Sequence, residues 1–143
     1  MTVLIDTNVV LDVLLGRALF ATQSAKVLFL SEKAMIDGYI SASAATDIFY
    51  VARKEFQDKD KAYEAMEKLF QAVKVAAVDS ETIDGALELR WNDFEDCVQF
   101  VAARGLDAKY IVTRDMSGFN DSEIVPITPA EFLNVLKYGE NEL

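Results

Sequence analysis

Residues 2–10 read Thr2-Val3-Leu4-Ile5-Asp6-Thr7-Asn8-Val9-Val10, and this stretch indicates the class of fold. Thr2–Ile5 is a short apolar run with β-branched side chains, which predicts a buried strand that ends at Asp6. The next segment, Thr7–Leu15, is apolar and is expected to form a helix that ends near Gly16. Strands that alternate with helices are characteristic of α/β folds.

The same alternation continues along the rest of the chain. Further strands are predicted at Ile36–Ser41, Val73–Val78, Tyr110–Thr113 and Glu123–Ile127. Further helices are predicted at Ala21–Lys33, Ala42–Phe56 and Lys59–Ala72, after an N-cap at Ser80, from Asp93 to about Gly105, and after Thr128-Pro129. Met116–Ser122 is expected to be a polar loop. This order predicts an α/β fold with a mainly parallel sheet, in a single domain over residues 1–143.

The composition limits the kinds of chemistry that the chain can perform. It has 143 residues, one cysteine (Cys97) and no histidine. An intramolecular disulfide, a histidine general base and a zinc site of several Cys or His ligands are therefore excluded. The net charge is -10, and a protein this acidic does not hold nucleic acid by bulk electrostatics. An RNA substrate would require bound cations and a local basic rim, and a positively charged protein partner would also suit the surface.

Neither a membrane span nor a secretion signal is predicted. No stretch approaches the ~18 apolar residues that a spanning helix needs, and Asp6 interrupts the first apolar run. We therefore expect a cytoplasmic protein that does not bind a membrane.

Two aspartates follow predicted strands. Asp6 comes directly after Val3–Ile5, and Asp115 comes two residues after Tyr110–Thr113. In a parallel α/β sheet, ligands bind outside the carboxyl ends of the strands, near a switch in strand order. Each aspartate also has an ordinary structural explanation, because Asp6 could cap the following helix and Asp115 could make an Asx-turn.

Two further aspartates lie on predicted helices. Asp47 is inside the Ala42–Phe56 helix with no basic residue one turn away, so its carboxylate must find water, a distant cation or a metal. Asp96 stands with Asp93 and Glu95 near a helix start, and the clustered charges would repel one another. A solvated boundary position is the alternative for Asp47, and a capping pair with Asp93 is the alternative for Asp96.

Four convergent aspartates would suit a hard divalent cation. Mg²⁺ and Mn²⁺ prefer oxygen ligands, and a chain rich in aspartate without histidine suits them better than it suits zinc. Such a cation makes water acidic enough to attack a phosphodiester and offsets the developing charge. The residues alone do not identify a phosphodiester as the substrate.

Several stretches, in order, resemble one known family. Val3–Val10 resembles the first strand and the Asp-Thr-Asn motif of PIN domains. Asp96–Gly105 is similar to the family's aspartate-led helix, and Ile111–Asp115 is similar to the Thr-Arg-Asp end of its fourth strand. Phe119 and the Pro-Ile-Thr-Pro run at 126–129 resemble the end of the same domain. The resemblance covers nearly the whole chain and implies a three-layer α/β/α sandwich with a mainly parallel central sheet.

The resemblance also implies roles for individual residues. Asp6, Asp96 and Asp115 take the positions of metal-site acids, and Asp47 stands where the family usually has Glu. Gly118 stands where a further acid is often found.

Other positions are expected to support this site. Thr7 and Thr113 match family positions whose hydroxyl groups hold the metal ligands in place. Arg114 and Arg53 are candidate contacts for RNA phosphates. Trp91 is expected to lie in the core or at a dimer interface rather than to stack on bases.

By resemblance, the expected function is hydrolysis of RNA phosphodiester bonds by an Mg²⁺- or Mn²⁺-dependent endoribonuclease. Many small PIN proteins are VapC-type toxins, so an antitoxin partner and a homodimer are expected. One alternative is a PIN fold with weak or no turnover that binds RNA or protein, which Asp47 and Gly118 favour. A phosphatase or phosphorelay domain is disfavoured, because Thr7-Asn8 follows Asp6 and no Asp stands two residues after it.

Overall fold

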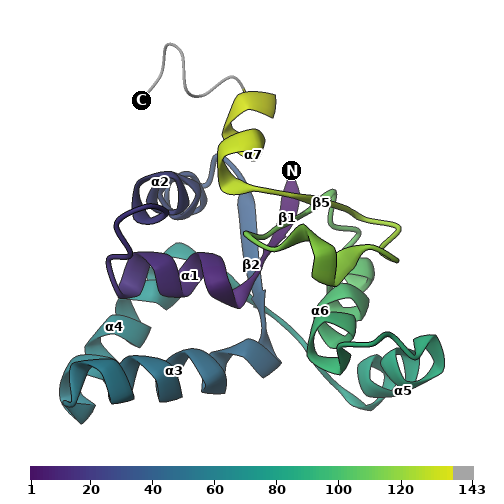
Figure 1. Cartoon of the computed structure of the whole chain (residues 1–143), viewed down its shortest axis with the longest axis horizontal. Helices are drawn as coiled ribbons and strands as arrows, with labels where there is room; N and C mark the ends of the chain where they lie inside the picture. The colour runs from purple at the N-terminus through teal and green to yellow at the C-terminus, as the bar shows by residue number, and fades with distance from the viewer. Residues whose placement is uncertain (137–143) are drawn as a thin grey trace.

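The computed structural model describes residues 1–136 and contains a five-stranded sheet flanked by helices (Figure 1). The strands are β1 (Thr2–Ile5), β2 (Asp37–Ser41), β3 (Lys74–Ala76), β4 (Tyr110–Val112) and β5 (Val125–Ile127). Every neighbouring pair is parallel, in the order β3-β2-β1-β4-β5. The predicted mainly parallel sheet is therefore confirmed.

The helices cover both faces of this sheet. They are α1 (Thr7–Leu14), α2 (Ala21–Glu32), α3 (Ala42–Phe56), α4 (Lys59–Ala72), α5 (Ser80–Leu89), α6 (Phe94–Gly105) and α7 (Pro129–Val135), with a short 3-10 helix, η1 (Met116–Phe119), between β4 and β5. In Figure 1, α1 to α4 lie on one side of β1 and β2, and α5 and α6 lie on the other. This arrangement is the expected three-layer sandwich.

Alternate side chains of β1 divide the core into two layers. Val3 and Ile5 pack among buried residues of α1, α2 and α7, whereas Leu4 packs among those of α5 and α6. Successive side chains of a strand point to opposite faces, so a strand that is buried on both faces is a continuous apolar run. This double burial holds β1 in place and positions Asp6 at its end.

Predicted element boundaries agree with the structure to within two residues, but one predicted cap is wrong. The N-cap of α5 is Asp79 rather than Ser80. The Asp79 carboxylate accepts a hydrogen bond from the Thr82 backbone N–H (3.0 Å), and the Thr82 hydroxyl accepts one from the Asp79 backbone N–H (3.3 Å). This reciprocal capping box satisfies two backbone donors, which explains why Asp79 caps the helix.

The sheet switches its direction of growth between β1 and β4. From β1 it extends through β2 to β3, and the chain then returns to the other side of β1 for β4 and β5. Such a switch opens a crevice at the carboxyl ends of the two strands. The register pairs Ile5 with Val112, so the next residues, Asp6 and Thr113, leave the sheet side by side.

Among residues 1–136, none of the helices combines the length and the apolarity that crossing a bilayer requires.

Candidate active site

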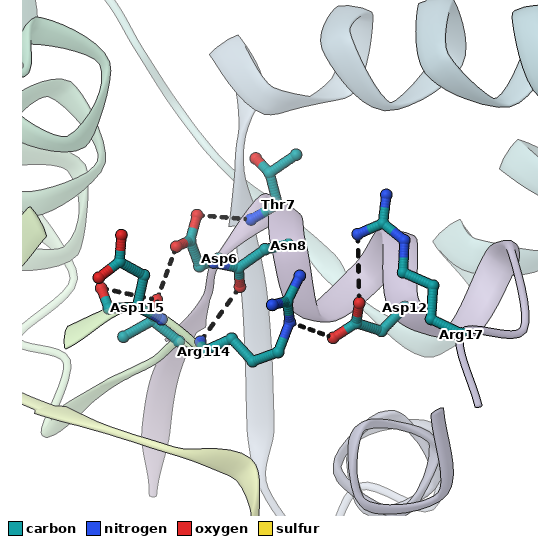
Figure 2. A network of polar contacts seen from close by, with 8 residues as sticks. Asp6, Thr7, Asn8, Asp12, Arg17, Arg114 and Asp115 are labelled. Atoms are coloured by element: carbon teal, nitrogen blue, oxygen red, sulfur yellow. Dashed lines mark hydrogen bonds and ion pairs between the residues drawn. The ribbon is translucent and has the colours of Figure 1, made fainter. Parts of the chain in front are cut away.

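Asp6 lies at the centre of a hydrogen-bond network at the carboxyl end of β1 (Figure 2). Its Oδ1 accepts hydrogen bonds from the backbone N–H of Thr7 (2.7 Å) and from Nε2 of Gln99 (3.0 Å). Its Oδ2 accepts one from Oγ1 of Thr113 (2.8 Å). Asp6 is only 6% exposed, and these donors replace water around its carboxylate. The side chain is therefore held in one orientation, while Asp6 also serves as the N-cap of α1.

Thr113 links Asp6 to the loop that carries Asp115. The Thr113 hydroxyl donates to Asp6 and accepts a hydrogen bond from the backbone N–H of Asp115 (3.1 Å). The Asp115 side chain is exposed, and its Oδ1 accepts a hydrogen bond from the backbone N–H of Ser117 (3.2 Å). Asp115 thus makes the Asx-turn considered as its structural alternative, at the start of η1. Its Oδ2 accepts no hydrogen bond from any residue that the structure describes.

Asp96 lies in the first turn of α6. Its backbone N–H donates to the carboxylate of Asp93, the N-cap of that helix (3.0 Å), so the capping pair is present. Its pKa is raised to about 7 by partial burial and by the negative charges of four neighbours, Asp6, Asp93, Glu95 and Asp115. Such repulsion is strong only between nearby charges. The carboxylates of Asp6, Asp96 and Asp115 therefore share one neighbourhood.

Asp47 approaches this cluster through Glu95. The Asp47 side chain is exposed on α3, in the boundary position considered as its alternative. Burial is the largest cause of a raised pKa at Glu95, and the charge of Asp47 is the next largest, followed by Asp93 and Asp6. Glu95, exposed in the first turn of α6, therefore lies close enough to Asp47 and Asp6 for their charges to act on it.

Gln99 is a site residue that sequence reasoning missed. It is 1% exposed and donates to Asp6, and its Oε1 has no hydrogen-bond partner among residues 1–136. The sequence feature that could have identified Gln99 is a side-chain amide inside an apolar run, one helical turn after Asp96.

The hydroxyl of Thr113 makes the expected contact with Asp6, whereas the buried hydroxyl of Thr7 makes none within the described residues.

A buried ion pair holds Arg114 on the other side of the network (Figure 2). Arg114 Nε donates to Oδ2 of Asp12 (2.7 Å), whose side chain is fully buried, and Arg17 donates to Oδ1 of the same carboxylate (3.2 Å). The Arg114 guanidinium also lies 4.2 Å from the ring centroid of Phe20, and its backbone N–H donates to Oδ1 of Asn8 (3.2 Å). Arg114 thus has a structural role, and its contact with RNA stays a prediction.

The donor chemistry at this edge of the sheet fits a hard divalent cation. The acids offer only oxygen, and a cation would relieve their mutual repulsion. In their present rotamers, no three acidic or cysteine side chains among residues 1–136 lie close enough together to hold one ion. Hydrogen bonds account for part of this spacing, because Asp6 is bonded to Thr113 and Gln99, and Asp115 to Ser117. The acids are neighbours, but they do not form a complete coordination shell.

Comparison with known families agrees with this architecture. A model of the PIN domain matches residues 2–117, a range that contains all four predicted site aspartates. The chain belongs to the PIN domain family.

Individual relatives are similar over most of their length. Ribonuclease VapC1 of Aquifex aeolicus (strain VF5) is 26% identical over 138 residues, which cover 91% of this chain and 92% of that protein. The structure of VapBC2 from Rickettsia felis bound to a DNA fragment from their promoter matches with a TM-score of 0.69 at 14% identity, covering 89% of this chain and 97% of the matched chain. A toxin-antitoxin complex from Klebsiella pneumoniae matches with a TM-score of 0.66 at 17% identity, with the same coverage. These two structural matches establish the fold.

Proposed function

We propose that this protein is an Mg²⁺- or Mn²⁺-dependent ribonuclease that hydrolyses RNA phosphodiester bonds. The observation that carries the proposal is the fixed carboxylate of Asp6 beside Asp96 and Asp115, at the switch between β1 and β4. The ribonuclease name of a relative that is similar over 91% of the chain supports RNA as the substrate.

Asp6, Asp96 and Asp115 would hold the cation, and Thr113 and Gln99 would orient Asp6 for that purpose. When bound, the cation supplies Lewis acidity, which lowers the pKa of water and offsets the charge that builds up at phosphorus. Binding would require Asp96 to lose the proton that its raised pKa favours.

Asp47 would complete the cage or orient the attacking water, acting together with Glu95. Burial and the nearby charge of Asp47 raise the pKa of Glu95, so a bound cation would also relieve the repulsion between these two side chains.

RNA must approach a chain whose net charge is -10. Arg53, exposed on α3, and Arg114 are the proposed phosphate contacts. Arg114 is bonded to Asp12 through Nε, and its terminal nitrogens make no hydrogen bond within residues 1–136. Because few basic groups take part, we expect RNA binding to depend more on the divalent cation than on bulk ionic strength.

A cleavage assay on the purified chain tests the proposal. Labelled RNA should be cut with Mn²⁺ or Mg²⁺ and left intact with EDTA, and Asp6→Asn should abolish the cutting. Asp107→Asn is the matched control, because Asp107 is exposed and has a φ of 53°, a conformation that Asn tolerates. Cutting that survives Asp6→Asn would indicate a contaminating nuclease, and a wild-type chain inert with both cations would overturn the proposal.

The second candidate is a PIN fold with weak or no turnover that binds RNA or protein. The observation that favours it is the incomplete coordination shell among residues 1–136, together with Gly118 at a position where an acid would add a ligand. RNA binding by the wild-type chain without cleavage at any cation concentration would support this candidate.

We also propose that the protein is a cytoplasmic toxin that pairs with an antitoxin and forms a homodimer. Two of the similar structures are complexes whose names describe VapBC2 and a toxin-antitoxin pair, which supports an antitoxin as the partner. Co-expression with the product of an adjacent small reading frame should give a complex on size exclusion with light scattering. Recovery of the chain alone, as a monomer, would contradict both parts.

A further inference from the structure

A polar hollow of about 240 Å³ opens beside the acidic cluster, between the residues that precede α6 and those of η1 and the loop after it. Its wall contains one indole ring, two side-chain amides and two carboxylates, from Trp91, Asn92, Asn120, Asp93 and Asp121. This combination of a flat aromatic group with hydrogen-bonding groups is suited to a planar polar ligand.

Two direct hydrogen bonds join the hollow to the acidic cluster. Asp93, in the wall, accepts from the backbone N–H of Asp96. Ser117, also in the wall, donates its backbone N–H to the carboxylate of Asp115. The wall further includes Gly118, against which the Asp96 carboxylate lies. A nucleotide whose phosphate lay at the acidic cluster would therefore have its base within reach of this hollow.

The indole of Trp91 forms a supported aromatic surface in the wall. It is half-buried and stacks on Phe100, with ring centroids 4.9 Å apart, and meets Phe119 edge-on at 6.3 Å. The expected core position of Trp91 is therefore correct for part of the ring, while the ring also lines the hollow. Aromatic side chains held in this way are the usual partners of unstacked bases in single-stranded RNA.

The polar groups of the wall favour a ligand that donates hydrogen bonds. The carboxylates of Asp93 and Asp121 only accept hydrogen bonds when ionised. The side-chain amides of Asn92 and Asn120 each offer both an acceptor oxygen and an NH₂ donor, so the excess of acceptors in the wall comes from the two carboxylates. Adenine, cytosine and guanine each carry an exocyclic amino group with two donors for these acceptors, whereas uracil in a nucleotide has a single donor, N3–H, flanked by two carbonyls.

We infer that this hollow is a base-binding subsite for a ribonucleotide whose base carries an exocyclic amino group, namely adenine, cytosine or guanine, in preference to uracil. The inference rests on the proposed function only in that the neighbouring phosphate would lie at the acidic cluster. The preference would give the proposed cleavage a sequence bias at one nucleotide.

Trp91 is the one tryptophan in the chain, so its fluorescence reports on the hollow directly. The full chain would be titrated in Mg²⁺ with the 5′-monophosphates of adenosine, cytidine, guanosine and uridine. We expect a saturable change with the first three, and roughly 3- to 10-fold weaker binding of the uridine nucleotide, the range for one or more lost hydrogen bonds.

Asn120→Ala should weaken the binding of the three amino-bearing nucleotides by roughly 3- to 10-fold, because it removes a hydrogen-bonding group from the wall. Asn134→Ala, an exposed asparagine on α7 outside the hollow, is the matched control and should bind as the wild type does. Circular dichroism and thermal melting of both variants would establish that they are folded.

An unchanged Trp91 signal, equal affinity for all four nucleotides, or full affinity in Asn120→Ala would overturn the subsite. Because mononucleotides contain no phosphodiester bond, these results do not depend on cleavage. RNA cutting without any nucleotide effect on Trp91 would reject the subsite and keep the ribonuclease. Weaker binding of the uridine nucleotide than of the other three, without any RNA cutting, would reject the ribonuclease and keep the subsite.

Discussion

The carboxylate of Asp96 lies over the Cα of Gly118, in the space that a side chain at position 118 would need. A Cβ built on Gly118 would collide with Oδ2 of Asp96, and the three nearest atoms it would meet all belong to Asp96. The resemblance to PIN domains places an acid at this position in many members. In this chain, the lack of a side chain at 118 is what allows Asp96 to occupy its present position.

Gly118→Ala is therefore expected to displace the Asp96 carboxylate while leaving the fold intact, because the atom that must move ends a short side chain. We expect Mn²⁺ affinity, measured by electron paramagnetic resonance, to fall by roughly 10-fold, the scale on which mispositioned ligands act. Gly105→Ala is the control, since a Cβ there meets nothing within 4 Å. Unchanged affinity in a folded Gly118→Ala variant would show that this position does not control the metal site.

Asp96→Asn should stabilise the metal-free protein, and more so at higher pH. The pKa of Asp96 is about 7 in the folded chain and near the ordinary aspartate value of 3.8 when unfolded. As pH rises between these values, the unfolded state loses the proton first, so the stability of the wild type falls and the loss is complete above about pH 7. The variant lacks this penalty.

Urea unfolding in EDTA would measure the difference. From about pH 5 to about pH 8, the advantage of Asp96→Asn should grow by roughly 1–2 kcal/mol, a value reduced from the full shift because the carboxyl is partly exposed. Added Mn²⁺ should stabilise the wild type and leave the variant nearly unaffected. A pH-independent difference would show that Asp96 does not carry the repulsion assigned to it.

Thr113→Val should test the support that Thr113 gives to Asp6. Valine has nearly the same shape, but it leaves the buried Asp6 carboxylate with one donor fewer and the Asp115 N–H without its acceptor. We expect a loss of about 1–3 kcal/mol in the free energy of unfolding and weaker Mn²⁺ binding. Thr113→Ser keeps the hydroxyl and should retain Mn²⁺ affinity; equal losses in both variants would assign the effect to packing.

Asp12→Ala should be strongly destabilising. Its fully buried carboxylate pairs with Arg114 and Arg17, and its removal leaves both partly exposed arginines without that partner, at about 1.5–3 kcal/mol. Arg17→Ala should change stability by at most about 1 kcal/mol, because the Arg17 side chain is 39% exposed. Thermal melting would measure the loss of stability in each variant. Equal losses in Asp12→Ala and Arg17→Ala would contradict the larger contribution assigned to the Asp12–Arg114 pair.

The order of elements could be predicted from the sequence because its causes are local. The apolar run Thr2–Ile5, the helical spacing of Ala42–Phe56 and the proline after Thr128 each act through neighbours within one or two turns of chain. The aspartates at strand ends follow from the same local pattern, and Asp6 and Asp115 could be proposed for that reason.

Tertiary structure alone decided which side chains meet. Gln99 bonds to Asp6 across 93 positions of sequence, and Asp96 lies over Gly118, because α6 packs against β1 at the strand switch. Likewise, Asp12 is paired with Arg114 only because β4 returns to lie beside β1. Spacing along a helix or strand carries no information about such distances, since they depend on strand order and on the packing of whole elements. The sequence by itself determined the elements and the acids at their ends, and packing determined their partners.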